Sequence, residues 1–195
     1  MEEDFVIERP AKPVIQPKKA VRMKVVSMGD AAVGKSCLIK RYCERRFVSK
    51  YITTIGVDFG VKPAEVKGRE VKVNFWDLAG PKEYFDVRNE FYKDSQGALL
   101  VYDVSSRPTF ESLDTWMAEA LKHGAPKDMV VYVCANKSDK MKREVTEKEG
   151  RVWAQRRGFK FFQTSANSGE GVDDMFEGIF AEVYERFFSF TEDIL

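Results

Sequence analysis

Cysteine and histidine are scarce in this chain of 195 residues, which contains three cysteines and one histidine. Cys37, Cys43 and Cys134 form no closely spaced set, and His123 lies near none of them in the sequence. A structural zinc site needs such a set of thiolate and imidazole ligands. The sequence therefore argues against structural zinc, and it favours three free thiols in a reducing compartment.

Long apolar segments and an excess of one charge are also lacking. No run approaches the ~18 apolar residues of a membrane-spanning helix, and the acidic start MEEDFVIERP has no apolar core typical of a secretory signal. Lys and Arg number 32 against 31 Asp and Glu, so no overall field favours nucleic acid or an anionic membrane. We expect a cytoplasmic or nuclear protein with no nucleic-acid partner.

Prolines and charges set residues 1–20 apart from the rest of the chain. Proline fixes φ and removes a backbone donor, which favours an extended segment outside a folded core. We predict a flexible N-terminal arm at 1–20, one folded domain at 21–190 and a short tail at 191–195. The alternative for the arm is a docking segment that uses its apolar residues 5–7.

From residue 21 onward, short apolar runs alternate with amphipathic stretches. Buried strands are expected at 23–29, 98–104, 129–136 and 159–165, with a hairpin over 58–77 that turns at 67–69. Helices are expected near 35–46, 82–95, 109–123, 144–157 and 171–188, and the apolar stripe of the last one favours core packing over a lipid or cofactor surface. This order predicts an α/β fold with a six-stranded, mostly parallel sheet, one antiparallel edge strand and helices on both faces.

The segment GDAAVGKS, residues 29–36, follows the first expected strand and precedes the first expected helix. It fits the pattern G-x-x-x-x-G-K-[ST], in which backbone amides at a helix N-terminus surround a phosphate. Lys35 would bridge the β- and γ-phosphates and Ser36 would bind Mg²⁺, whereas a chance glycine turn is the alternative. The residues that we expect to contact the nucleotide here are Asp30, Ala31, Ala32, Val33, Gly34, Lys35, Ser36 and Cys37.

The segment ANKSD, residues 135–139, follows another expected strand and indicates which base is bound. The Asp139 carboxylate can accept hydrogen bonds from the ring N–H and the 2-amine of guanine, whereas adenine offers neither donor there. Asn136 can tie neighbouring loops together, and the Lys137 stem can lie across the base. Ser165 and Ala166, at the end of the next strand, can offer a backbone amide to the guanine carbonyl. A surface run of charges is the alternative for this short pattern.

Together these motifs resemble the Ras superfamily of small GTPases over about residues 22–190, and YITTIGVDFGVK and FWDLAG are most similar to its Rab branch. The resemblance implies a P-loop NTPase G domain with GTP or GDP and Mg²⁺ as ligands. By the same resemblance Thr54 would bind Mg²⁺ and γ-phosphate, Asp77 would hold Mg²⁺ through water, and the Gly80 amide would contact γ-phosphate. The resemblance also adds three nucleotide-binding residues, namely Phe47, Tyr51 and Asn167.

Two features depart from the Rab pattern. Pro81 stands where the family carries a glutamine that orients the attacking water, and neither a C-terminal cysteine nor an N-terminal Met-Gly offers a lipidation site. The altered switch, DLAGPKEYF, is similar to the RJL family of Rab-like GTPases, some of which carry a J domain. This sequence contains no His-Pro-Asp motif typical of that module, so we expect neither a J domain nor a direct lipid anchor. The occurrence of the RJL family follows that of flagellated organisms, so the resemblance suggests a ciliary or flagellar role.

We therefore expect a monomeric GTP-binding switch that hydrolyses GTP slowly. It would bind effectors and an exchange factor through two segments, residues 48–60 (the first switch) and 78–92 (the second switch). Lys35 and the Gly80 amide would remain as catalytic groups, with Pro81 at the glutamine position. The alternatives are a scaffold locked with GTP and an incidental loop substitution at Pro81, whereas the guanine motif disfavours a P-loop phosphotransferase.

Apolar residues beside the expected switches are candidate effector contacts, for which ordinary packing is the alternative. These residues are Ile55, Val57, Phe59, Trp76 and Tyr92. Asp103 is expected to be a capping or surface carboxylate, and Leu78 is expected to pack in the core.

Overall fold

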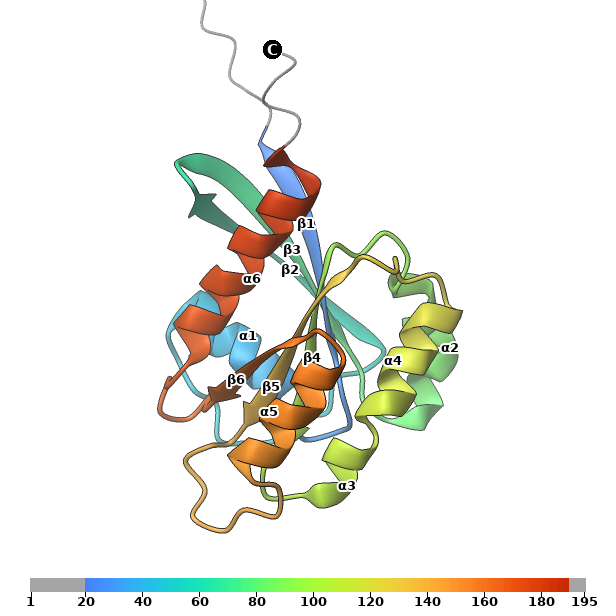
Figure 1. Cartoon of the computed structure of the whole chain (residues 1–195), viewed down its shortest axis with the longest axis vertical. Coiled ribbons are helices and arrows are strands. Elements are labelled where there is room, and N and C mark those ends of the chain that lie inside the picture. Colours follow the sequence, from blue (N-terminus) through green and yellow to red (C-terminus); the bar gives the residue numbers. More distant parts are fainter. Residues whose placement is uncertain (1–19, 190–195) are drawn as a thin grey trace, which may run out of the picture.

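The computed structural model describes residues 20–189, so the predicted N-terminal arm, apart from residue 20, and the predicted C-terminal tail lie outside it. Within this range one six-stranded sheet has the order β2-β3-β1-β4-β5-β6 (Figure 1). Its strands are β1 (Val21–Met28), β2 (Val57–Val66), β3 (Arg69–Leu78), β4 (Gly97–Asp103), β5 (Val130–Asn136) and β6 (Lys160–Thr164). β2 and β3 pair antiparallel and the other neighbouring pairs are parallel, which confirms the predicted fold class.

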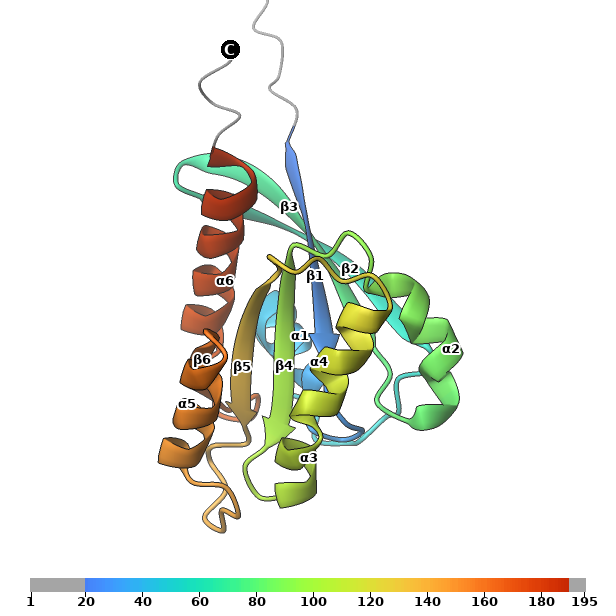
Figure 2. The same ribbon diagram turned by 45° about the vertical axis from the view of Figure 1, so that its right-hand side comes forward.

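Helices cover both faces of this sheet, as Figure 2 shows for α4 and α6. The α-helices are α1 (Lys35–Glu44), α2 (Phe85–Arg88), α3 (Arg107–Glu111), α4 (Leu113–Lys122), α5 (Glu147–Arg156) and α6 (Val172–Phe187), and the 3-10 helices are η1 (Lys82–Tyr84) and η2 (Asn89–Phe91). α1 and α6 pack on one face, and α4 and α5 pack on the other. Among the described residues, no helix is long and apolar enough to cross a membrane.

Two predicted helices are wrong as continuous elements. The helix expected at 82–95 is divided into η1, α2 and η2, because Tyr84 leaves the helical region at φ −96° and ψ 12° and tertiary contacts of Arg88 hold the short pieces. The helix expected at 109–123 is divided into α3 and α4 at Ser112, whose hydroxyl donates back to the carbonyl of Thr109 at 3.1 Å. A serine that bonds to its own backbone in this way competes with helical hydrogen bonds.

The hairpin between β2 and β3 turns as the sequence indicated. Val66 pairs with Arg69 across a two-residue loop, and Lys67 and Gly68 both have positive φ, at 50° and 75°. This is the conformation that matches the twist of the two flanking strands. The hairpin therefore forms the antiparallel edge of the sheet.

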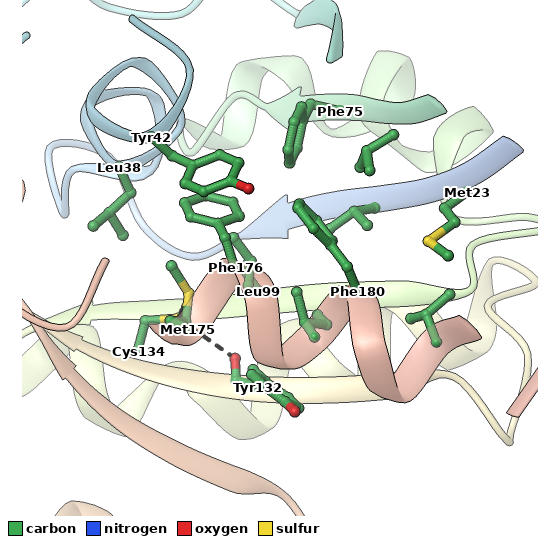
Figure 3. Close-up of a cluster of buried hydrophobic side chains, with 14 of the residues drawn as sticks. Met23, Leu38, Tyr42, Phe75, Leu99, Tyr132, Cys134, Met175, Phe176 and Phe180 are labelled. Carbon is green, nitrogen blue, oxygen red and sulfur yellow. Dashed lines mark hydrogen bonds between the residues drawn. The ribbon is translucent and has the colours of Figure 1, made fainter. Parts of the chain in front are cut away.

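The apolar stripe of α6 lies in the core, as predicted, where Val172, Met175, Phe176, Ile179, Phe180, Val183 and Tyr184 are buried. Phe176 stacks on Tyr42 of α1 with ring centroids 4.5 Å apart (Figure 3). Leu78 is fully buried against the opposite face of the sheet, also as predicted. None of the three cysteines, which all lie within residues 20–189, forms a disulfide.

The register of the parallel strands brings several loops to one edge of the sheet. Ser27 pairs with Asp77 across β1 and β3, and Asp103 pairs with Asn136 across β4 and β5. Asn136 also pairs with Thr164 of β6. Because ligands of open α/β sheets bind at the carboxyl ends of strands, this edge positions the candidate site.

Candidate nucleotide-binding site

A cavity of about 380 Å³ lies where these loops meet. It is lined by fifteen of the predicted nucleotide-binding residues, namely Ala31, Ala32, Gly34, Lys35, Ser36, Cys37, Phe47, Tyr51, Thr54, Gly80, Asn136, Lys137, Asp139, Ala166 and Asn167. Pro81 lines it as well. Segments that are far apart in the sequence therefore converge on one cavity.

Three predicted nucleotide-binding residues, Asp30, Val33 and Ser165, are not among the residues that line this cavity, and a nucleotide contact through their backbone stays a prediction. Val33 is buried in the core. The Asp30 carboxylate accepts a hydrogen bond from the indole of Trp116 at 2.7 Å, and the Ser165 hydroxyl donates to Asp139 at 2.6 Å. These three side chains thus contact the core or neighbouring residues, and these contacts support the loops around the cavity.

The conformation of the P-loop, which is the segment GDAAVGKS at residues 29–36, depends on two of its glycines. Gly29 has φ 137° and Gly34 has φ 100°, values that residues with a side chain rarely adopt. A Cβ at Gly29 would overlap the carbonyl oxygen of Val101, and one at Gly34 would overlap the Asn136 amide. Any other residue would therefore push the loop away from β4 at Gly29 or displace the Asn136 side chain at Gly34.

The Lys35 ammonium lies over its own loop. It donates to the carbonyl oxygens of Gly29 at 2.7 Å and Asp30 at 2.9 Å. Burial lowers the pKa of this ammonium to about 8, although the Asp77 and Asp30 carboxylates act in the opposite direction. A phosphate bound in the cavity would place a negative charge beside this ammonium and so favour its charged form, against the effect of burial.

The three predicted Mg²⁺ ligands lie together. The Ser36 hydroxyl donates to the Asp77 carboxylate, and the Thr54 hydroxyl oxygen is 3.0 Å from that of Ser36 and 3.4 Å from Asp77 Oδ2. Ser27, which no sequence motif indicated, donates its hydroxyl to Asp77 Oδ1 at 2.6 Å and orients the carboxylate. Hydroxyl and carboxylate oxygens are the donors that Mg²⁺ prefers, so this cluster fits that ion.

The guanine-recognition motif is held by side-chain hydrogen bonds. Asn136 donates to the carbonyl of Val33 at 2.7 Å and accepts from the Thr164 hydroxyl at 3.3 Å, so it ties the P-loop to β6. Asp139 accepts from Ser165 at 2.6 Å and from the Asn167 amide at 3.1 Å. The hydrogen bond from Ser165 lowers the pKa of Asp139, which keeps an ionised acceptor at the cavity wall.

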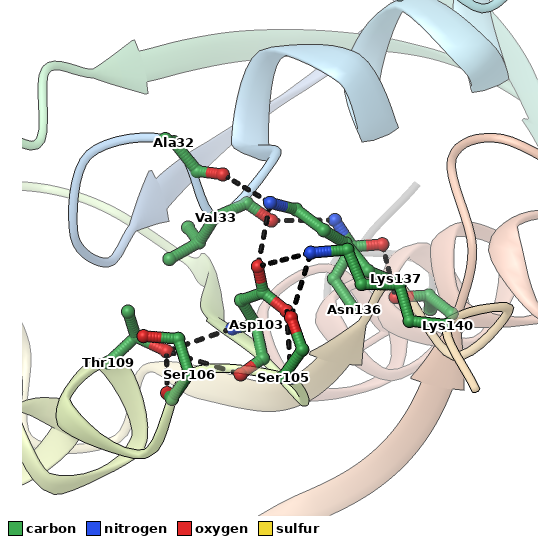
Figure 4. A network of polar contacts seen from close by, with 10 residues as sticks. Ala32, Val33, Asp103, Ser105, Ser106, Thr109, Asn136, Lys137 and Lys140 are labelled. Carbon is green, nitrogen blue, oxygen red and sulfur yellow. Dashed lines mark hydrogen bonds and ion pairs between the residues drawn. The ribbon is translucent and has the colours of Figure 1, made fainter. Parts of the chain in front are cut away.

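Asp103 is a capping carboxylate, as one of the two expectations had it, but it is not at the surface (Figure 4). It is buried, and its Oδ2 is 2.7 Å from the Lys137 ammonium and 3.4 Å from that of Lys140. Its Oδ1 accepts from the backbone N–H and the hydroxyl of Ser105. Burial raises the pKa of Asp103, but the hydrogen bonds from Lys137 and Ser105 outweigh it and lower the pKa below its ordinary value. The cause is the register of β4 with β5, which brings Asp103 beside the loop of Lys137.

The start of the second expected switch packs tightly against the P-loop. A Cβ at Gly80 would overlap the backbone of Asp30 and Ala31, so only glycine fits there. Pro81 follows at φ −59°, a value that the proline ring favours. The sequence did not identify Arg88, which is buried and donates to the carbonyl of Pro81 at 2.9 Å.

The candidate effector contacts divide by exposure. Ile55 is 78% and Phe59 50% exposed, whereas Val57 and Trp76 are half-buried, and Trp76 packs between the rings of Phe59 and Phe91. Tyr92 is fully buried and donates to Glu119 at 2.6 Å. Tyr92 is therefore wrong as an effector contact, because its ring packs in the core.

Comparisons with known proteins agree with this geometry. A sequence model of the Ras family matches residues 24–185. DnaJ homolog subfamily C member 27 from Rattus norvegicus is 53% identical over 175 residues, which cover 87% of this chain and 64% of the relative. The Homo sapiens protein of that name is 51% identical over the same shares, and the Danio rerio protein is 54% identical over 171 residues, or 85% of this chain and 63% of the relative. The chain thus spans about 64% of the length of curated relatives that it matches.

Proposed function

Because the chain belongs to the Ras family, we propose that it is a GTP-binding switch that requires Mg²⁺, hydrolyses GTP slowly and contacts effector proteins in its GTP state. One observation carries the proposal: the residues predicted to recognise the base, to bind phosphate and to bind Mg²⁺ line or adjoin a single cavity. The matched region covers only 64% of the Rattus norvegicus relative, so the proposal concerns this region alone.

Guanine recognition would rest on Asp139. Its carboxylate is oriented by Ser165 and Asn167, which leaves acceptor capacity for the ring N–H and the 2-amine of guanine. Adenine has no donors at the corresponding positions, so the remaining acceptor capacity of the carboxylate would stay unfilled. An unpaired polar group in a binding site lowers affinity strongly. Phe47 and the Lys137 stem line the same cavity and would cover the base.

Phosphate binding would rest on Lys35 and the backbone amides of the P-loop at the N-terminus of α1. Ser36 and Thr54 would hold Mg²⁺, with Asp77 acting through water. When bound, the ion would neutralise charge on the β- and γ-phosphates. Thr54 lies beside Ser36 and Asp77, so the three side chains could reach one ion together.

Hydrolysis would be slow because of Pro81. The glutamine usual at this position orients the attacking water through a side-chain amide, and proline carries neither a donor nor an acceptor there. The substitution removes only the N–H of residue 81, so the Gly80 amide stays available to the γ-phosphate. The GTP state should therefore form normally and persist.

Effector binding would use the exposed part of the first switch and β2. Ile55 and Phe59 present apolar side chains to solvent there, next to the half-buried Val57 and Trp76. Exposed apolar side chains beside a ligand-dependent loop are typical of protein contacts. An exchange factor would act on the same switches, with the protein itself as a monomer.

A second candidate function is a scaffold that binds GTP and does not cycle. The observation that favours it is Pro81, which lines the cavity and has no side-chain amide that could orient a water. The two candidates share nucleotide binding and differ only in whether GTP is turned over.

Nucleotide content and turnover test both candidates. The purified protein is denatured and its released nucleotide identified by chromatography, and single-turnover hydrolysis of bound GTP is then followed with Mg²⁺ present. Guanine nucleotide with slow conversion to GDP supports the switch, whereas guanine nucleotide with no conversion supports the scaffold. Release of adenine nucleotide, or no binding of added GTP, would overturn the proposal. Lys35→Met should abolish binding, and Lys122→Met, which changes an exposed lysine that does not line the cavity, serves as its control.

A further inference from the structure

A buried ion pair joins the second switch to α4. The Arg88 guanidinium makes a bidentate contact with the Glu119 carboxylate, with Nε to Oε1 at 2.6 Å and Nη2 to Oε2 at 2.8 Å. The two side chains are only 4% and 10% exposed. Tyr92, from the segment after η2, donates its hydroxyl to the same carboxylate at 2.6 Å. A buried pair of this geometry fixes the orientation of the guanidinium.

The remaining nitrogen of Arg88 is directed at the backbone of the switch. Nη1 donates to the carbonyl oxygens of Ala79 and Gly80, both at 3.3 Å, and of Pro81 at 2.9 Å. These three carbonyls belong to the segment that carries the Gly80 amide. Because Arg88 uses carbonyls and not side chains, this hold on the segment is compatible with proline at position 81.

The opposite side of the same segment lies against the P-loop. Gly80 packs on the backbone of Asp30 and Ala31 so closely that no Cβ would fit. Trp116 of α4 connects the two sides, because its indole donates to Asp30 at 2.7 Å and its ring lies 4.4 Å from the Arg88 guanidinium. Residues 79–81 are thus held between the P-loop and a set of four residues, Arg88, Tyr92, Trp116 and Glu119, which we call the switch clamp.

We propose that Arg88 is a positioning residue that sets the preference of this protein for GTP over GDP. By holding the Ala79, Gly80 and Pro81 carbonyls, the clamp would keep the Gly80 amide at the cavity wall, so GTP would gain this hydrogen bond without having to order the segment. Once the clamp is broken, the segment samples other conformations, and the γ-phosphate must select the competent one. GDP has no group at this position, so its affinity does not depend on the clamp. The inference rests on the proposed guanine-nucleotide binding.

The test compares affinities for GDP and for a non-hydrolysable GTP analogue in wild type and Arg88→Met, by competition against a fluorescent guanine nucleotide with Mg²⁺ present. We expect the preference for the GTP analogue over GDP to fall about 10-fold in the variant, while the GDP affinity stays within about twofold of wild type. Arg88→Lys can still donate to carbonyls but cannot make the bidentate pair, so it should lie between the two. A role in fold stability alone would lower both affinities together.

The matched control is Arg107→Met, which removes a second bidentate arginine–glutamate pair. Arg107 contacts Glu149 at 2.7 and 3.0 Å from α3, and neither residue lines the cavity. This control should leave the preference unchanged. Should Arg88→Met fail to fold, Glu119→Gln and Tyr92→Phe take its place, with the larger fall expected for Glu119→Gln.

A preference within about twofold of wild type in Arg88→Met, or in Glu119→Gln where that variant is used, would overturn the inference. The failure of the proposed function is distinguishable, because wild type would then bind neither guanine nucleotide. Hydrogen exchange of the amides of residues 78–84 in nucleotide-free protein adds a direct readout of the segment. These amides should exchange faster in Arg88→Met than in wild type, and equal rates would count against the clamp.

Discussion

The two ends of the cavity are built differently. At the guanine end, side chains of the motif hold one another and the P-loop, as Asn136 does through Val33 and Lys137 does through Asp103. At the other end, which is the proposed γ-phosphate end, Lys35, Ser36 and Thr54 line the cavity together with Gly80 and Pro81, and Arg88 donates to the backbone carbonyls of the last two. In the proposed function, guanine recognition would thus rest on side chains of the motif itself, whereas the Gly80 amide would depend on support from α4.

This difference separates binding from hydrolysis. Replacing one residue at the γ-phosphate end can remove the orientation of water and leave the Gly80 amide in place. A replacement at the guanine end removes recognition itself. Variants at each end should therefore have distinct consequences, and these are ordered below from the largest expected effect to the smallest.

Asp139→Asn should have the largest effect. It replaces an ionised acceptor of two hydrogen bonds by an amide that meets the guanine donors with one of its own, so the GTP affinity should fall roughly 10³-fold. Xanthine, which offers a carbonyl in place of the 2-amine, should lose less affinity. Competition binding measures both, and Asp128→Asn, at an exposed aspartate that does not line the cavity, is the control. A fall of less than about tenfold would argue against Asp139 as the guanine-reading group.

Removal of Mg²⁺ should have the next largest effect, at the γ-phosphate end. Chelation should speed GTP release about 10- to 100-fold, because phosphate charge is then left to Lys35 and the amides alone. Thr54→Ala should reduce this dependence on the metal for GTP more than for GDP. Thr53→Ala, which changes an exposed neighbour that does not line the cavity, should behave as wild type. Equal release rates with and without Mg²⁺ would rule out the cluster of Ser36, Thr54 and Asp77 as its site.

Asp103→Asn should have a smaller effect, again at the guanine end. The change removes the charge that pairs with Lys137 at 2.7 Å, so guanine nucleotide should dissociate about 10-fold faster. Lys140→Met removes the longer contact to Asp103, at 3.4 Å, and a hydrogen bond to the Ser105 hydroxyl at 2.8 Å, and it should change the rate less. Stopped-flow release of a fluorescent nucleotide measures both variants. An unchanged rate in Asp103→Asn would mean that Lys137 is held adequately by the Ala32 carbonyl.

The smallest effect concerns acid stability. Burial raises the pKa of Glu119, but the hydrogen bonds from Arg88 and Tyr92 outweigh it and lower the pKa, and that of Asp103 is lowered likewise. A carboxyl whose pKa is lower in the folded state stabilises the fold above its unfolded pKa of about 4, and this contribution is lost as the pH falls through the folded pKa.

The melting temperature of wild type should therefore exceed those of Glu119→Gln and Asp103→Asn at pH 7, by about 2–4 °C for each kcal/mol lost. These differences should shrink as the pH falls below about 4. Melting curves recorded between neutral pH and pH 3 test this, and a difference that grows on acidification would contradict it.

Local patterns were enough to predict much of the fold and half of the site. Apolar periodicity gave the strands and α6, and the P-loop and ANKSD are contiguous motifs that form where their flanking strands end. The turn at Lys67 and Gly68 could be predicted for the same reason, since a glycine within the turn adopts its positive φ readily.

The remaining features depend on contacts between distant segments. Arg88 meets Glu119 and Asp103 meets Lys137 only through the packing of α4 and the register of β4 with β5. The sequence shows four charged residues but not which of them are buried together. Tyr92 was misjudged for the same reason, because its hydroxyl finds a partner in α4. The break in the helix expected at 82–95 follows from these contacts.

Single-turnover hydrolysis of GTP by wild type and by Pro81→Gln tests the central claim most directly. We expect the two proteins to bind GTP with affinities within about threefold of each other, because the Gly80 amide and the switch clamp are unchanged. Pro81→Gln should hydrolyse bound GTP about 10-fold faster or more, since the glutamine amide restores the orientation of water. Equal rates in the two proteins, with GTP equally bound, would contradict the assignment of slow hydrolysis to Pro81.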